Sequence, residues 1–158
     1  MPSDVEPVLP KVPFEMCPIW ASLGVFGRKW SLILLRDMFF LKYDKFGQFL
    51  RNNLGLTPRA LSMRLRDLQR EGIIQRVVFS DEKRDVRYKL TRKGLDSIPI
   101  LTAFIQYGIR HHADRVFEDG KPRKLSQVFP EKQPLMLGKL LLAYARETNA
   151  KLETGSQQ

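Results

Sequence analysis

The chain has 158 residues and a mass of 18.4 kDa, the usual size of one domain with a short extension. It carries 27 Lys and Arg against 17 Asp and Glu, giving a formal charge of +10 at pH 7, and 43% of its residues are hydrophobic. This apolar content excludes a basic disordered tail. The excess of positive charge makes a polyanion, either nucleic acid or an anionic membrane surface, the expected class of partner.

Several other classes of protein are excluded by the same composition. The longest apolar stretch, residues 30–41, contains two charged side chains and is far shorter than the roughly 20 residues that a membrane-spanning helix requires. The proline-containing N-terminus lacks the pattern of a secretory signal, so we expect a cytoplasmic protein. With one cysteine, Cys17, and two histidines, the chain is expected to contain neither an internal disulfide nor a metal site nor a cofactor.

The N-terminal half begins with an expected irregular arm, residues 1–13, in which prolines disfavour helix. Apolar spacing then predicts three helices, over residues 18–26, 29–41 and 45–52. We interpret the first two as scaffold helices. The second is expected to direct four side chains toward a core: Trp30, Ile33, Leu34 and Met38.

Residues 57–72 are the most informative segment. Thr57 suits an N-cap, Pro58 stands at the first helical position and Gly72 follows the expected end, so a helix of about four turns is predicted. One face of this helix is apolar, with Leu61, Leu65 and Leu68. The opposite face is basic, with Arg59, Met63, Arg66 and Arg70 flanked by Ser62 and Arg64.

The pattern changes after Gly72 from helical spacing to strands. β-Branched and aromatic residues predict a strand over residues 73–79, and alternating apolar and basic residues predict a second over residues 86–90. A charged turn, residues 80–85, joins them. The segment is therefore expected to form a β-hairpin with a charged tip.

The C-terminal part is predicted to be largely helical. One long helix is expected from Arg92 to about Phe117, bent at Pro99. Three segments are expected to follow it: a polar linker over residues 118–133, an apolar helix over residues 134–150, and a disordered tail over residues 151–158.

Both C-terminal helices are candidates for a dimer interface. The apolar stripe of the long helix can pack against its own domain or against a second chain, and we favour the second chain because the helix extends beyond what a small domain covers. The later apolar helix is expected to pack across the dimer, the alternative being another protein. The candidate interface residues are Ile98, Leu101, Ile105, Ile109, His112, Leu137 and Leu141.

The element order predicts a mostly α protein with a small β-hairpin wing (α+β), namely a winged helix-turn-helix domain over residues 14–117 with long C-terminal helices forming a dimer interface. An α-helix fits the major groove of B-form DNA, and its exposed face needs arginines for guanine edges and phosphates, with small residues for close approach. The candidate contacts from the helix are Thr57, Arg59, Ala60, Ser62, Met63, Arg64 and Arg66, and those from the wing are Lys83, Arg84 and Arg87.

Simpler interpretations exist for parts of this basic face. Any soluble protein has solvated helix surfaces, but here helix, wing and charge agree on DNA. Arg66 is equally suited to DNA contact or to pairing with a scaffold carboxylate. Arg70, near the helix end, can simply complement the helix dipole.

Four stretches of the chain form a recognisable pattern in this order: Cys17–Trp30, Lys45–Leu50, Gly55–Ile74, and Val86–Thr91 with Gly94, Pro99, Tyr107 and Gly108. Together they resemble the HxlR-type prokaryotic regulators, part of the wider MarR-like winged-helix group. The resemblance implies a homodimeric DNA-binding transcriptional regulator that is not an enzyme and is associated with the nucleoid.

Two features depart from that family. Its second wing strand usually contains Arg-Val-Glu-Tyr, whereas this chain has Asp85-Val86-Arg87-Tyr88, with acid and base exchanged. The residues after the long helix also extend beyond the usual family length.

Cys17 resembles an N-terminal cysteine that serves some family members as a redox or electrophile sensor. The alternative is a buried and inert thiol. Sensing would require both a low thiol pKa and access of the oxidant or electrophile to the sulfur.

The sequence as a whole predicts a homodimer that inserts the helix over residues 57–71 into successive major grooves of a palindromic operator, with half-site centres about 34–36 Å apart. The effector, a small molecule or an oxidant, is not identified. The alternative function is a sequence-neutral architectural protein or a general transcription component. An enzyme is not expected, because the sequence has no phosphate-binding Gly-rich loop and no triad spacing.

Overall fold

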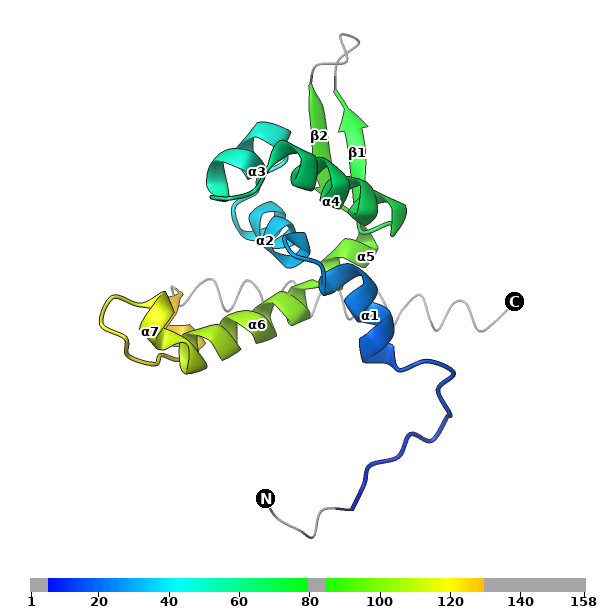
Figure 1. Ribbon diagram of the computed structural model, residues 1–158, viewed down its shortest axis with the longest axis vertical. Coiled ribbons are helices and arrows are strands. Elements are labelled where there is room, and N and C mark those ends of the chain that lie inside the picture. Colours follow the sequence, from blue (N-terminus) through cyan, green and yellow to red (C-terminus); the bar gives the residue numbers. More distant parts are fainter. Residues whose placement is uncertain (1–5, 80–84, 130–158) are drawn as a thin grey trace. The chain divides into compact units, whose positions relative to one another are not determined.

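The computed structural model describes residues 6–79 and 85–129 (Figure 1). The chain divides into two compact units, one ending at Ile98 and the other beginning at Pro99. The first unit contains five helices and a β-hairpin in the described part, and the second contains almost all of the longest described helix and two short ones. None of the helices in the described ranges has both the length and the apolar character needed to cross a bilayer.

The first three helices lie close to their predicted positions. They are α1 (Pro18–Phe26), α2 (Ser31–Phe40) and α3 (Phe46–Asn52). Helix α2 begins two residues later than predicted because Trp30, directly before it, has a left-handed backbone with φ of 80°, which a continuous helix does not permit.

Helix α4 (Pro58–Arg70) begins and ends at the predicted signals. The Thr57 hydroxyl oxygen accepts a hydrogen bond from the Ala60 amide at 3.2 Å, which satisfies one of the free donors of the first turn. At the other end Gly72 adopts φ of 70°, a conformation that glycine reaches without a steric penalty. The chain therefore leaves α4 sharply and enters the hairpin.

The hairpin consists of β1 (Ile74–Val78) and β2 (Val86–Leu90), paired antiparallel from Ile74 opposite Leu90 to Val78 opposite Val86. Helix α4 packs against α3 and β1, and the hairpin projects beyond α4 (Figure 1). The predicted helix-turn-helix and wing are thus both present. Their core is formed by side chains that are at most 2% exposed: Leu34, Leu35, Phe49, Leu61, Leu65, Leu68, Ile73 and Ile74.

The helix expected from Arg92 to about Phe117 is not continuous. It is divided into α5 (Arg92–Leu95), α6 (Ile98–His111) and α7 (Ala113–Val116). The first break occurs where the Ser97 amide and hydroxyl both donate to the Gly94 carbonyl, at 3.1 and 2.6 Å, and where Pro99 has no amide to continue the helical pattern. The second break occurs at His112, whose ψ of 31° lies outside the helical range.

Residues 118–133 were expected to be a linker, and their described part contains a short helix, α8 (Leu125–Val128). The predicted helix over residues 134–150 and the predicted tail over residues 151–158 lie outside the described residues, as do the first five residues of the predicted arm.

Gly94 in α5 provides a test of this packing. A Cβ at this position would lie 2.2 Å from the Ile73 carbonyl oxygen, so backbone would have to move. We expect Gly94→Ala to lower the free energy of unfolding by about 1–3 kcal/mol, measured by denaturant titration.

The matched control is Gly24→Ala in α1, where a Cβ meets no atom within 4 Å. Because alanine favours helix over glycine, this variant should gain about 0.5–1 kcal/mol or remain unchanged. Equal stability of the Gly94→Ala variant and the parent would contradict the close approach of α5 to the strand.

Candidate nucleic-acid interface

The exposed face of α4 is basic, as predicted. Arg59, Met63 and Arg66 are exposed, and Ala60 and Ser62 are half-buried beside them. The Arg66 Nε donates to the Ser62 carbonyl oxygen at 3.3 Å, so its side chain lies along its own helix. Neither Arg59 nor Arg66 forms an ion pair with the described residues, and scaffold pairing of Arg66 is therefore not observed there.

Arg64 does not lie on the exposed face where the sequence placed it. It is 8% exposed, and its Nη1 lies 3.1 Å from Asp67 Oδ2. The physical reason is helical spacing: Arg64 stands three residues after Leu61 and four before Leu68, which places it at the edge of the buried stripe. Arg64 is therefore a scaffold residue of α4 in this structure.

Two further residues of α4 also have local roles. Thr57 is exposed, and its hydroxyl caps the helix. Arg70, 69% exposed in its side chain, donates to Asp67 at 2.5 Å. Arg70 therefore pairs with a neighbour one turn away, in keeping with its interpretation as a residue that serves the helix end.

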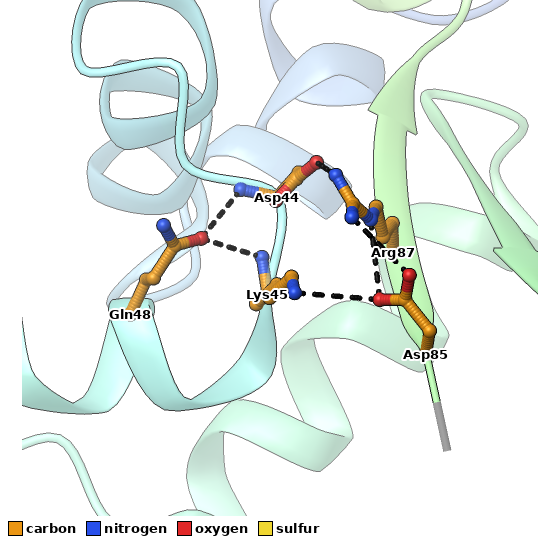
Figure 2. A network of polar contacts seen from close by, with 5 residues as sticks. All are labelled: Asp44, Lys45, Gln48, Asp85 and Arg87. Atoms are coloured by element: carbon orange, nitrogen blue, oxygen red, sulfur yellow. Dashed lines mark hydrogen bonds and ion pairs between the residues drawn. The ribbon is translucent and has the colours of Figure 1, made fainter. Parts of the chain in front are cut away.

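Arg87, expected beside the charged tip, lies on β2 and is held by two carboxylates (Figure 2). Its Nη1 is 3.3 Å from Asp44 Oδ2, and its Nη2 is 3.2 Å from Asp85 Oδ2. The Lys45 Nζ lies 3.4 Å from the other oxygen of Asp85. The side chain of Arg87 is 34% exposed. Its guanidinium thus belongs to a network of alternating charges; the other wing candidates, Lys83 and Arg84, lie outside the described residues.

The electrostatics of this network favour the ionised forms of both partners. The hydrogen bond from Arg87 lowers the pKa of the Asp85 carboxyl below the ordinary value of an aspartate, with Lys45 acting in the same direction. The hydrogen bond to Asp85 in turn raises the pKa of the Arg87 guanidinium. Both shifts favour the charged forms of Asp85 and Arg87, the forms that attract each other.

Sequence reasoning did not find the residues that hold Arg87. Asp44 is 43 positions away from it, and no local pattern indicates such a pair. The hairpin also exposes Arg76 and Lys89, whose strand alternation could have marked them as cations available to a polyanion. Lys89 Nζ lies 4.8 Å and Arg87 Cζ 4.9 Å from the centre of the Phe79 ring.

Cys17 is exposed and directly precedes α1. In the single chain the thiol is accessible, whereas the alternative expected a buried cysteine. Three apolar side chains of α1 are also exposed: Ile19 and Trp20 at 71% each, and Leu23 at 49%.

The candidate dimer residues of the long stripe differ in exposure. Ile98, Leu101 and Ile109 are buried in the single chain, Ile105 is half-buried and His112 is exposed. Leu137 and Leu141 lie outside the described residues. The apolar surface that α6 leaves exposed comes from Phe104 and Tyr107, which the sequence pattern did not single out.

Comparison with known proteins identifies the family. The family model for the HxlR-like helix-turn-helix matches residues 25–115, which is more than half of the chain. The chain belongs to the HxlR-like helix-turn-helix family. The match contains the whole helix-turn-helix and hairpin described above, whereas Cys17 and residues beyond 115 lie outside it.

Individual relatives agree with this assignment. An uncharacterized HTH-type transcriptional regulator of Bacillus subtilis (strain 168), YdeP, is 33% identical over 103 residues, which cover 65% of this chain and 79% of YdeP. The redox regulator HypR is similar in structure: its oxidized form has a TM-score of 0.54 at 34% identity, covering 58% of this chain and 94% of HypR. Its reduced form has a TM-score of 0.55 at 32% identity, covering 65% and 99%.

These relatives are transcriptional regulators and not enzymes, in agreement with the prediction from the sequence. The mostly α fold with a hairpin wing is likewise confirmed for this HxlR-like chain. Within the described ranges, no three His, Cys, Asp or Glu side chains gather closely enough to hold a metal ion.

The pKa of Asp85 can be measured directly. In a pH titration followed by side-chain carboxyl NMR, we expect its midpoint below about 4 in the parent, and an upward shift toward that ordinary value in Arg87→Ala.

Because the pKa of Asp85 is lowered in the folded state, its pairing with Arg87 stabilises the protein more at neutral pH than in acid. The pairing contributes above the unfolded-state pKa of about 4 and is lost as the pH falls through the folded-state value. The stability difference between the parent and Arg87→Ala should therefore be constant from neutral pH to about pH 4 and shrink below it. An Asp85 midpoint at or above the ordinary value would contradict the pairing.

Proposed function

We propose that this HxlR-like protein is a sequence-specific regulator of transcription that binds double-stranded DNA as a homodimer on a palindromic operator. The observation that carries the proposal is the exposed face of α4, where Arg59 and Arg66 have no carboxylate partner among the described residues. A guanidinium left free in this way can bind a guanine edge with two hydrogen bonds or bind a phosphate. Ala60, Ser62 and Met63 lie between them and let a base approach.

The packing of α4 supports the proposal that this helix contacts the bases of the duplex. Leu61, Leu65 and Leu68 are at most 1% exposed and hold the helix against α3 and the hairpin. An arginine on such a fixed helix loses less conformational freedom on binding than one on a loop. The hairpin beside α4 is suited to reach the flanking backbone or minor groove with Lys83 and Arg84.

The homodimer is supported by apolar surface that one chain leaves in water. Ile19, Trp20 and Leu23 of α1 are exposed, and so are Phe104 and Tyr107 of α6. Exposed aromatic and aliphatic side chains grouped on one helix are typical of an interaction surface, and each of the two helices carries such a group. A two-fold dimer would place two copies of α4 on half-sites about 34–36 Å apart, which predicts a palindromic operator.

A redox response is the second part of the proposal. HypR, similar in structure to this chain, is a redox regulator, and here Cys17 is exposed. An exposed cysteine before α1 can form a disulfide with its copy in the partner chain or with a small thiol, which would change the relative orientation of the two α4 helices. We propose that the protein acts in the cytoplasm on the nucleoid, with an oxidant or a small molecule as effector.

The reading helix is tested by Arg59→Ala and Arg66→Ala. We expect each to weaken binding to a duplex selected from a randomised library by about 1–3 kcal/mol if the side chain contacts a base. Fluorescence anisotropy at fixed salt measures the affinity, and footprinting should show two symmetric half-sites.

The matched control is Arg110→Ala, which removes an exposed arginine from α6. It should change the affinity for the selected duplex far less. Unchanged affinity in both α4 variants would show that α4 does not contact the bases. Equal affinity of the parent for selected and random duplexes would favour a sequence-neutral architectural protein.

The redox response is tested by Cys17→Ser. After mild oxidation we expect the parent to form a mixed disulfide or a covalent dimer, seen by mass spectrometry, and to change its affinity for the selected duplex. The variant should show neither effect. Identical behaviour of parent and variant under oxidation would leave Cys17 without a sensing role.

A further inference from the structure

The middle of the wing is attached to the start of α3 by several contacts (Figure 2). The Tyr88 amide of β2 donates to the Asp44 carbonyl oxygen at 2.8 Å. The next side chain along the strand, Arg87, reaches the carboxylate of the same Asp44 at 3.3 Å. Below them the rings of Tyr88 and Phe49 meet edge to face, with centres 6.4 Å apart.

Asp44 is itself held in place by α3. The Gln48 side-chain oxygen accepts hydrogen bonds from the Asp44 amide at 3.0 Å and from the Lys45 amide at 2.9 Å. This arrangement fixes the backbone directly before α3 and thereby the position of both charged side chains. The partners of β2 are thus set by the first turn of α3, a helix held in the core by Phe49, and not by a free loop.

The hairpin is also attached at its base. The Thr91 amide donates to the Ile73 carbonyl oxygen at 3.0 Å, and the Thr91 hydroxyl donates to the Gly72 carbonyl oxygen at 2.6 Å. A two-stranded hairpin is only marginally rigid by itself. These bonds close the base of the hairpin itself, where the chain arrives from α4 at Gly72 and leaves for α5 after Thr91, and both helices pack on the strands there. The contacts of Arg87 and Tyr88 with Asp44 hold β2 a second time, further from the base. Two such places define a direction, whereas one would leave a pivot.

The charge of Arg87 is offset within the network. Arg87 and Lys45 alternate with Asp44 and Asp85, so two positive and two negative charges lie together. A cation neutralised in this way offers little to a phosphate. Arg76 and Lys89 of the same hairpin are exposed and form no ion pair with the described residues.

We propose that Arg87 is a positioning residue, which sets the direction of the wing relative to α4 through Asp44 and does not itself bind DNA. This inference rests on the proposed function, because it assumes that the wing contacts the same duplex as α4. It assigns Asp44, an acid, a favourable role in binding a polyanion.

The two possible roles of Arg87 predict opposite effects of Asp44→Ala. If the pair positions the wing, losing the acid weakens binding to the selected duplex by about three- to tenfold, as does Arg87→Ala, and the double variant is no weaker than either. If Arg87 binds phosphate, removing a nearby negative charge leaves binding unchanged or strengthens it. An Asp44→Ala variant that binds the selected duplex as tightly as the parent, or more tightly, would overturn the proposal.

The salt dependence of binding gives a second readout. If Arg87 binds a phosphate, Arg87→Ala lowers the slope of log affinity against log salt concentration by about 1 and Asp44→Ala does not, whereas a positioning pair gives the same slope in both variants. The matched control is Arg76→Ala, which removes one unpaired charge from the hairpin. Its effect on the free energy of binding should add to that of Asp44→Ala, whereas the effect of Arg87→Ala should not. A slope lowered by Arg87→Ala and not by Asp44→Ala would contradict the proposal.

The direction of the wing can also be measured without DNA. Residual dipolar couplings of the β1 and β2 amides should fit one alignment together with those of α2–α4 in the parent. They should depart from it in Asp44→Asn, which keeps the side-chain size, and in Arg87→Gln, which removes the charge. Couplings that stay unchanged in both variants would overturn the inference. If the parent binds no duplex, the proposed function fails, while these couplings still decide what Arg87 does.

Discussion

The helix-turn-helix depends on a carboxylate in its core. Asp37 of α2 is completely buried, and its two oxygens accept hydrogen bonds from Arg36, Asn52 and Asn53. Its backbone carbonyl oxygen accepts from the Leu41 and Tyr43 amides, both at 3.1 Å. A buried charge is costly unless such partners surround it, so these contacts must form together. One residue therefore ends α2, directs the loop that follows and holds the end of α3.

The contacts of Asp37 extend to α4 and to the hairpin. The loop it directs, residues 41–45, contains Asp44 and Lys45, which bind the wing. The end of α3 that it holds leads to Leu56 and Thr57, from which α4 begins. The orientation of α4 and the attachment of β2 thus depend on the same buried group, through opposite ends of α3.

The sequence predicted most of the fold because its signals are local. Thr57, Pro58 and Gly72 bound α4, and the change from helical to alternating spacing marks the hairpin.

Where the prediction was wrong, the deciding contact cannot be recognised from a local sequence pattern. Arg64 has the chemistry of an exposed residue and the helical position of a buried one, and its pairing with Asp67 resolves that conflict. The helix after Thr91 breaks because Ser97 bonds back to Gly94 next to Pro99, a combination that a pattern of apolar residues does not reveal. The pairing of Arg87 with Asp44, 43 positions away in sequence, also lies beyond any local pattern, whereas its expected contact with DNA stays a prediction.

The exchanged order of acid and base at Asp85 and Arg87 is explained by the charged residues that these two side chains contact. Asp85 faces Lys45 and Arg87 faces Asp44, so the strand and the loop before α3 are complementary as a set. In a family member with the opposite order, the same loop would meet like charges. A wing grafted from such a relative should therefore pack against this chain only when residues 44 and 45 are transferred with it.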